Sequence, residues 1–191
     1  MTPKTVAIIF GFTEGEWHGK RFRRHLREAG YEVIKKAADA DIIIAHSGGC
    51  YYVPRDLTTT QQVMLIDPPY WPARTIVRRG NNMLLHMTLQ VRPGNEPFYQ
   101  VHKTARNIAY LVRHARTNLA MMRHARVFNL ADNIAHPHTI LVHNEEDPWL
   151  TPDLAHLKRI NPYLRIHHLP GGHDDCWWHP EHYINLLQSD S

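Results

Sequence analysis

The chain has 191 residues, of which 43% are hydrophobic and 21% are charged. This is the composition of an ordinary globular protein, long enough for one domain with a sizeable core, and it shows no low-complexity segment or repeat. The net charge of +4 comes from 22 Lys and Arg against 18 Asp and Glu. That excess is too small to indicate nucleic acid as a partner without a clustered basic patch.

The first apolar run, from Val6 to Phe10, is too short for a signal-peptide core or a membrane span. Two cysteines, Cys50 and Cys176, are too few for a disulfide framework, although a single bridge between them stays open. We therefore expect a cytoplasmic protein with no membrane span, present as a monomer or a small homo-oligomer.

Six short apolar runs, bounded by Gly, Pro and polar residues, are typical of strands. They are hydrophobic throughout rather than alternating, which indicates parallel strands buried on both faces and joined by helical crossovers. The sequence thus predicts an α/β fold, a three-layer α/β/α sandwich with a mostly parallel sheet of about six strands. In chain order the runs are Thr5–Phe10, Tyr31–Ile34, Asp41–Ala45, Val63–Ile66, Thr139–Val142 and Leu164–His168.

Helices are predicted between these strands and after the last one. The link after Ile34 has room for only one or two helical turns. Thr151 is the expected N-cap of a later helix that runs to Ile160. The predicted helices are His18–Ala29, a short one between Cys50 and Leu57, Thr151–Ile160 and Pro180–Gln188.

The longest interval between strands runs from Asp67 to Pro137 and opens with the Pro-rich DPPYWP. From Val101, apolar residues recur at alternating steps of four and three, which indicates one stripe of a helix. We expect a single domain, 1–191, with a helical lid-like segment around 70–135. Arginines on the helix flank form either a solvated face or a surface for acidic partners: Arg106, Arg113, Arg116 and Arg123.

One buried strand ends on a serine that is set between small residues. The segment Ala45-His46-Ser47-Gly48-Gly49 has the form small-x-Ser-x-small, like the nucleophile elbow G-x-S-x-G. In such an elbow the residues two before and two after the serine approach the backbone, so only small side chains fit. A serine at a strand end can also be a helix N-cap, so these five residues alone leave two interpretations open.

A nucleophilic serine needs a base to take its proton and a carboxylate to hold that base. Two later strands run into loops with such groups. The strand Thr139–His143 is followed by the acidic NEEDPW, and the strand Leu164–Leu169 is followed by PGGHDD.

With these segments the chain resembles the α/β-hydrolases, of the small serine-hydrolase kind without a large separate cap domain. ILVHNEEDPWLTPD and LPGGHDDCWWHPEHY are similar to the acid and histidine regions of that family. By position, the resemblance implies Ser47 as the nucleophile, Asp147 as the acid and His173 as the base.

Neighbouring residues offer alternatives for two of these roles. Glu145 or Glu146 could be the acid, with Asp147 a turn residue before Pro148, although the family pattern favours Asp147. Other histidines fall on the predicted strand or the last helix rather than in the loop of His173: His167, His168, His179 and His182.

The resemblance also implies two backbone N–H donors for the oxyanion of a tetrahedral intermediate. One belongs to Gly48, directly after the nucleophile. The other belongs to Phe12, because Ile9-Phe10-Gly11-Phe12-Thr13 is similar to the family's H-G-F segment, with Phe10 where His is usual.

The sequence thus predicts a serine hydrolase that cleaves carboxylic esters, with amides and thioesters open, through an acyl-enzyme on Ser47. The alternative is a catalytically idle α/β-hydrolase fold that acts as a binding protein. The expected partner is a small-molecule acyl substrate, with Tyr70, Trp71 and the helix from Val101 as pocket walls. No cofactor is expected, and no metal either, because none of the 16 histidines has the spacing of a known site such as HExxH.

Overall fold

The computed structural model describes residues 2–11, 14–69, 130–147 and 154–189, with isolated positions between 105 and 120. The chain divides into two compact units, each described here by itself. The first comprises Met1–Gly11, Gly15–Tyr70 and Asn129–Ser191, and the second comprises Phe12–Glu14 and Trp71–Phe128.

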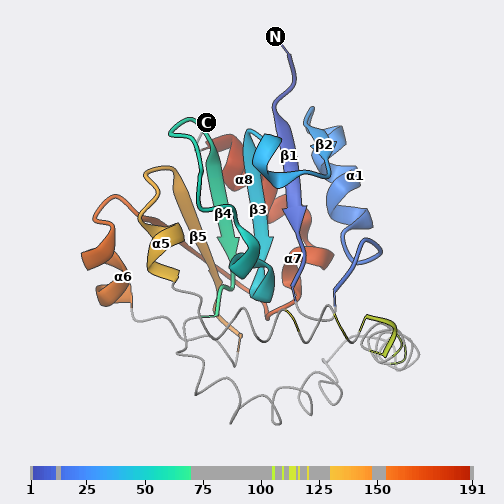
Figure 1. Cartoon of the computed structure of the whole chain (residues 1–191). Coiled ribbons are helices and arrows are strands. Elements are labelled where there is room, and N and C mark those ends of the chain that lie inside the picture. Colours follow the sequence, from blue (N-terminus) through green and yellow to red (C-terminus); the bar gives the residue numbers. More distant parts are fainter. Residues whose placement is uncertain are drawn as a thin grey trace. The chain divides into compact units, whose positions relative to one another are not determined.

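A six-stranded sheet, parallel at every pairing, forms the centre of the first unit (Figure 1). Each predicted apolar run forms a strand, with bounds within two residues of those expected. The strands are β1 (Thr5–Ile9), β2 (Glu32–Ile34), β3 (Ile42–His46), β4 (Gln62–Ile66), β5 (Thr139–Asn144) and β6 (Arg165–Leu169), in the order β2-β1-β3-β4-β5-β6.

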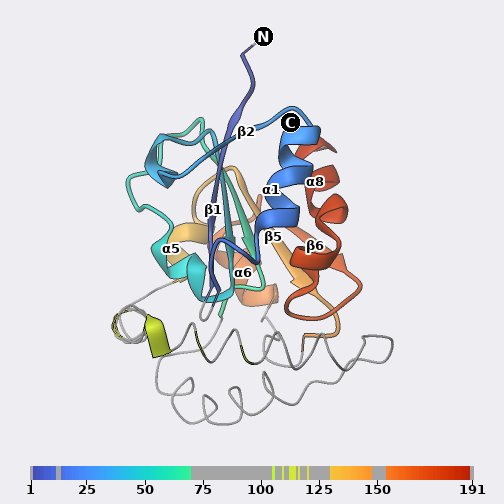
Figure 2. The same cartoon turned by 90° about the vertical axis from the view of Figure 1, so that its right-hand side faces the viewer.

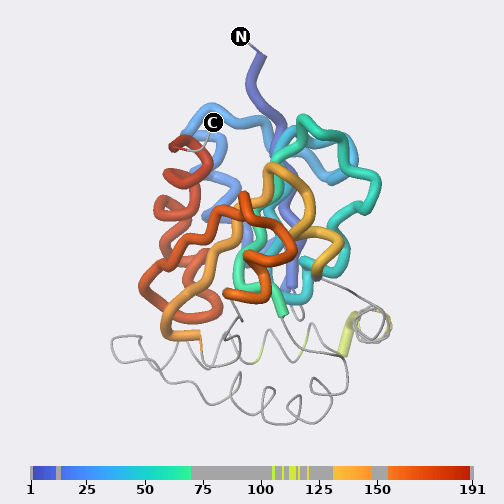
Figure 3. Tube along the Cα trace, turned by 90° about the vertical axis from the view of Figure 1, so that its left-hand side faces the viewer, coloured from blue at the N-terminus to red at the C-terminus, as the bar shows by residue number. Residues whose placement is uncertain are grey.

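Helices cover both faces of this sheet, as the edge-on views in Figure 2 and Figure 3 show. On one face lie α1 (Lys20–Glu28), α7 (Asp175–Trp178) and α8 (Pro180–Ser189). On the other lie the short helix η2 (Ser47–Tyr52) and α5 (Leu130–Ile134), with α6 (Leu154–Ile160) packed against α5. Because both faces are covered, every residue of β3, β4 and β5 is buried, and the predicted three-layer α/β/α architecture is confirmed.

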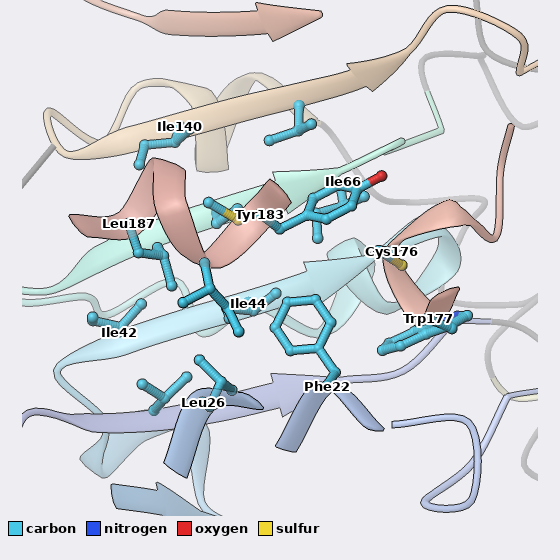
Figure 4. Packing of buried hydrophobic residues seen from close by; sticks show 14 residues of the cluster. Phe22, Leu26, Ile42, Ile44, Ile66, Ile140, Cys176, Trp177, Tyr183 and Leu187 are labelled. Atoms are coloured by element: carbon cyan, nitrogen blue, oxygen red, sulfur yellow. The ribbon is translucent and has the colours of Figure 1, made fainter. Parts of the chain in front are cut away.

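The core between the sheet and α1, α7 and α8 is built around three aromatic rings (Figure 4). The Phe22 ring centroid lies 5.9 Å from that of Trp177 and 6.3 Å from that of Tyr183. Alternate residues of three neighbouring strands meet these rings, as the period of two in a strand requires. They are Ile42, Ile44, Met64, Ile66, Ile140 and Val142.

Several helices differ in extent from the prediction. The short helix near Cys50 begins at Ser47 itself and ends at Tyr52, because the turn after β3 is already its first turn. The linker between β2 and β3 holds the single turn η1 (Ala37–Asp39), within the expected length. α7, between the loop of His173 and α8, was not predicted as a separate helix.

The predicted lid-like segment around 70–135 overlaps the second unit, but α5 belongs to the first. Of the helix predicted from Val101, isolated positions are described, and those that are helical are Ala105, Ala109, Val112, Arg113, Arg116 and Ala120. Phe12, Tyr70, Trp71, Val101 and Thr151 lie outside the described residues.

Two expectations about membranes and disulfides concern the described part of the chain. None of the helices described there is both long and apolar enough to cross a membrane. Cys50 and Cys176 are buried thiols that form no disulfide, so the bridge that the sequence left open is not formed.

Phe22 allows a direct test of the core around the three rings. Its side chain is fully buried, so we expect Phe22→Ala to lower the free energy of unfolding by about 3–5 kcal/mol through lost burial and the cavity that remains. Urea unfolding followed by circular dichroism measures this difference. Tyr163→Ala is the control, because the Tyr163 side chain is 83% exposed and its loss should change little. Equal effects of the two variants would contradict this description of the core.

Candidate active site

The carboxyl ends of the parallel strands meet at one edge of the sheet. The chain goes from β1 outward to β2 and then crosses to β3 on the other side of β1, so the strand order switches direction between β1 and β3. In open α/β sheets, ligands bind outside the carboxyl ends of the strands at such a switch point. Ser47 directly follows β3 and therefore lies beside it.

Ser47 occupies a strained turn. Its φ is +50°, in the left-handed region that non-glycine residues seldom adopt. On the far side of the turn, a Cβ atom added to Gly49 would lie 2.5 Å from the carbonyl oxygen of Ile9 and 2.7 Å from that of Phe10. Ala45, two residues before the serine, is completely buried. The small residues of this segment therefore sit where larger side chains would meet the backbone of β1 and the loop after it.

Ser47, His173 and Asp147 lie in one hydrogen-bonded line. The Ser47 Oγ atom is 2.8 Å from His173 Nε2, and His173 Nδ1 is 2.7 Å from Asp147 Oδ2. A carboxylate accepts, so Nδ1 carries the proton in the neutral ring, and Nε2 is free to accept from the serine hydroxyl. The three residues come from loops after β3, β5 and β6 and are up to 126 residues apart in sequence.

Backbone hydrogen bonds tie the loops of Asp147 and His173 together. The N–H of Glu145 donates to Leu169 O and the N–H of Glu146 donates to Gly171 O, each at 2.9 Å. Both glutamates are exposed, whereas Asp147 is buried against His173, so of the three acids weighed from the sequence Asp147 is the one in contact with the imidazole.

Three of the four competing histidines lie where the sequence predicted them, His167 and His168 on β6 and His182 in α8. The fourth, His179, lies between α7 and α8 rather than in the last helix. Gly171, which leads into the loop of His173, has a φ of +111° that favours glycine.

Two opposing effects set the pKa of the His173 imidazole. Burial disfavours the charged ring and would lower the pKa, but the negative charge and hydrogen bond of Asp147 outweigh burial. The pKa of His173 is therefore raised above the usual imidazole value. The nearby His46 ring opposes this rise, and the carboxylate of Asp67 adds to it.

Sequence reasoning missed the structural role of His46. This side chain is fully buried, and its Nε2–H donates to the carbonyl oxygen of His173 at 2.7 Å. The His46 ring centroid lies 4.8 Å from that of His173 and 5.2 Å from that of Trp177. The available signal was its position at the end of β3, two residues after Ile44, which puts it on the face that α7 covers.

A buried polar network beside the three residues was also missed. Asp67 directly follows β4 and is fully buried. Its Oδ1 accepts from the backbone N–H of Asn144 at 2.8 Å, and its Oδ2 accepts from the Asn144 side-chain amide at 2.6 Å. The Tyr183 hydroxyl donates to Asn144 Oδ1 at 2.7 Å, and burial raises the pKa of that phenol, so it remains a donor.

His143, the residue before Asn144 on β5, also lies near Asp67. Its Nδ1 lies 3.6 Å from Asp67 Oδ1, which is an ion-pair distance when the ring is protonated but too long for a hydrogen bond. The interaction with Asp67 raises the pKa of the His143 imidazole.

His46, Asp67 and His173 bring two ring nitrogens and a carboxylate oxygen within 4.8 Å of one another. Such a donor set could hold a metal ion. However, His173 already uses Nδ1 toward Asp147 and Nε2 toward Ser47, and His46 uses Nε2 toward the His173 carbonyl. These hydrogen bonds favour an electrostatic cluster over a metal centre.

Of the two predicted oxyanion donors, Gly48 lies among the described residues and Phe12 does not. Gly48 is buried and follows Ser47 in the first turn of η2, where backbone N–H groups have no partner within the helix.

Comparisons with known proteins place this architecture. No family model matches the sequence, and no curated protein does. A bromoperoxidase from Bacillus anthracis is similar in structure, with a TM-score of 0.70, 12% identity, and coverage of 99% of this chain and 92% of that one. A structure from a study of carboxylesterases of Nitrososphaera gargenis gives a TM-score of 0.67, 9% identity, and coverage of 98% and 89%. An N-formylmaleamic acid deformylase from Pseudomonas putida gives a TM-score of 0.62 and 14% identity, with coverage of 97% of this chain and 92% of that one.

The protein has the α/β-hydrolase fold. The predicted resemblance and fold class are therefore confirmed by solved structures that cover nearly the whole chain. Within this α/β-hydrolase fold, Ser47 stands on the turn after the third strand and the other two residues stand on loops after the last two strands.

Gly49 tests how tightly the turn of Ser47 is built. We expect Gly49→Ala to lower the free energy of unfolding by about 1–3 kcal/mol, because the added carbon would meet backbone atoms that can move only with β1. Thermal and urea unfolding measure this loss. A Gly49→Ala variant as stable as the wild type would contradict the close approach described here.

Proposed function

We propose that this protein is a serine hydrolase that cleaves carboxylic esters, with Ser47 as the nucleophile, His173 as the base and Asp147 as the acid. The observation that carries the proposal is the hydrogen-bonded line from Ser47 Oγ through the His173 ring to Asp147 Oδ2, at 2.8 and 2.7 Å. A line with these partners in this order is the arrangement that activates a serine hydroxyl at neutral pH.

In the acylation half-reaction, Ser47 Oγ attacks the carbonyl carbon of the ester while His173 Nε2 takes the hydroxyl proton. The imidazolium that forms is stabilised by Asp147. When the tetrahedral intermediate collapses, the carbon–oxygen bond to the alcohol breaks, and the alcohol leaves with the proton from Nε2. The acyl group remains on Ser47 as an ester.

In the second half-reaction, His173 Nε2 takes a proton from water, which attacks the acyl carbon. The bond between the acyl carbon and Ser47 Oγ then breaks, Ser47 Oγ takes the proton back from Nε2, and the carboxylic acid is released. The backbone N–H of Gly48 is the proposed donor to the oxyanion in both steps, with the N–H of Phe12 as the second donor. Loss of one such donor typically costs about 3 kcal/mol of transition-state stabilisation.

Esters are the proposed substrates because one of the similar solved structures comes from a study of carboxylesterases. The same three residues could also cleave amides and thioesters. The lid-like segment around 70–135 is the proposed wall of the acyl pocket. A cytoplasmic location is proposed because two cysteines are too few for the disulfide framework of a small secreted domain.

A fluorophosphonate probe tests the nucleophile, because it phosphonylates an activated serine oxygen with loss of fluoride. We expect the wild type to be labelled on Ser47 and Ser47→Ala to be unlabelled. Ser189→Ala is the matched control, since its hydroxyl lies at the end of α8 and donates to Leu186 O. Absence of labelling in folded wild-type protein would favour the alternative function, a binding protein with an idle hydrolase fold.

The pH dependence tests the base. His173 must be neutral to accept a proton, and its pKa is raised above the usual value of 6.5, because Asp147 outweighs burial. We therefore expect kcat/KM for p-nitrophenyl esters to rise with pH, with a midpoint above 6.5. A rate that is flat from acid to alkaline pH, or that falls across this range, would argue against His173 as the base.

A further inference from the structure

We infer that Asp67 is a positioning residue of this site: a second carboxylate that stabilises the protonated form of His173 during the reaction. The inference rests on the proposed function, because it assigns Asp67 an effect on the base of the serine hydrolase. Three independent features of Asp67 support it: its backbone conformation, its uncompensated charge and its distance from the imidazole.

The backbone places Asp67 beside Ser47. β3 and β4 pair in register up to His46 and Ile66, so the next residue on each strand is Ser47 on one and Asp67 on the other. Among the residues that the structure describes, these are the two non-glycine residues with positive φ, at +50° and +44°. Left-handed residues of this kind persist at functional sites because the surrounding structure holds them there.

The charge of Asp67 is buried without a full counter-charge. Its side chain is completely buried, and both oxygens accept hydrogen bonds from neutral groups of Asn144. Among the described residues its ion-pair partner is His143, at 3.6 Å, and only when that ring is protonated. A buried carboxylate is costly unless a positive charge accompanies it. The imidazolium that forms on His173 in each half-reaction supplies that charge.

The distance suits this role. An oxygen of Asp67 lies within 4.8 Å of a His173 ring nitrogen, in an interior where charges are screened far less than in water. Among the residues that the structure describes, the titratable groups that act on the charge of His173 are Asp147 after β5, Asp67 after β4 and His46 at the end of β3. Two of the three are carboxylates, and both favour the protonated ring.

Asn144 separates a charge effect from a purely structural one. Its backbone N–H and its side-chain amide both donate hydrogen bonds to Asp67, while its backbone carbonyl oxygen accepts from the N–H of Asp147 at 3.0 Å. Asn144→Ala removes the side-chain amide that donates to Asp67 Oδ2 but keeps both backbone hydrogen bonds of residue 144 and the charge of Asp67. Loss of the Asp67 charge would instead change the titration of His173.

The experiment follows the rate of fluorophosphonate labelling of Ser47 across the neutral pH range. We expect Asp67→Asn to move the midpoint of the acid limb to lower pH by roughly half a unit to one unit. Asn144→Ala, which removes one hydrogen bond to Asp67 but not its charge, should not move the midpoint to lower pH. Asp39→Asn, which removes one exposed carboxylate before β3, should change neither the rate nor the midpoint. An unchanged midpoint in Asp67→Asn, or an equal shift in Asp39→Asn, overturns the inference.

A double variant provides a second arm. With Asp147→Asn alone, Asp67 still stabilises the imidazolium. At a pH above both midpoints we therefore expect labelling faster than in the variant that also carries Asp67→Asn, by up to about ten-fold for a difference of one pKa unit. Equal rates in the single and double variants count against the inference.

If Asp67→Asn does not fold, the midpoint of the pH dependence of labelling in Asp147→Asn still tests whether Asp67 acts on His173. With Asp147 neutralised, burial and the His46 ring lower the pKa of His173, and Asp67 is the described carboxylate that still raises it, so we expect the midpoint to fall by less than two units. A midpoint lower by two units or more would overturn the inference. Absence of Ser47 labelling in the wild type would instead reject the proposed function, and an NMR titration of the His173 ring would then test Asp67 by itself.

Discussion

The in-register pairing of β3 with β4 is the constraint on which the site depends. It runs without a bulge from Ile42 opposite Gln62 to His46 opposite Ile66, so both strands stop at the same level. Neighbouring strands are separated by about 4.8 Å, and the residues that follow them therefore start side by side. A slip of one residue would turn every side chain of one strand to the opposite face and would move Ser47 out of line with the loops after β5 and β6.

The apolar core makes the strained edge possible. Two left-handed residues cost of order 1–3 kcal/mol each, and a buried carboxylate costs more unless it is hydrogen-bonded. These costs fall at the ends of β3 and β4, two of the three strands whose residues are buried at every position. Their hydrophobic burial, together with the aromatic packing around Phe22, offsets the strain. The same sequence pattern that predicts a buried strand thus also supports the polar residue at its end.

The sequence predicted the strands well because burial on both faces leaves continuous apolar runs that need no knowledge of partners. The segments around Ser47, Asp147 and His173 were found through local patterns and a family resemblance. His46 and Asp67 were missed for a different reason. His46 contacts the backbone of a residue 127 positions away, and Asp67 pairs with Asn144, 77 positions away. No local pattern encodes such partners. Asp67 did carry one signal, a polar residue directly after a buried strand, but the Pro-rich segment that follows it suggested only a loop.

Burial and base strength oppose each other at His173, the base of the proposed serine hydrolase. His173 is only 8% exposed, and burial disfavours the protonated ring and so weakens the imidazole as a base. One carboxylate restores the basicity through a hydrogen bond at Nδ1. A second carboxylate that acts through space can restore more without occupying a ring nitrogen, which leaves Nε2 for the serine. Because Asp67 is held by Asn144 rather than by the imidazole, its charge stays in place while His173 gains and loses its proton. In the proposed mechanism, two carboxylates around one buried histidine therefore keep its imidazole basic at the carboxyl ends of strands that are themselves buried, β3, β4 and β5.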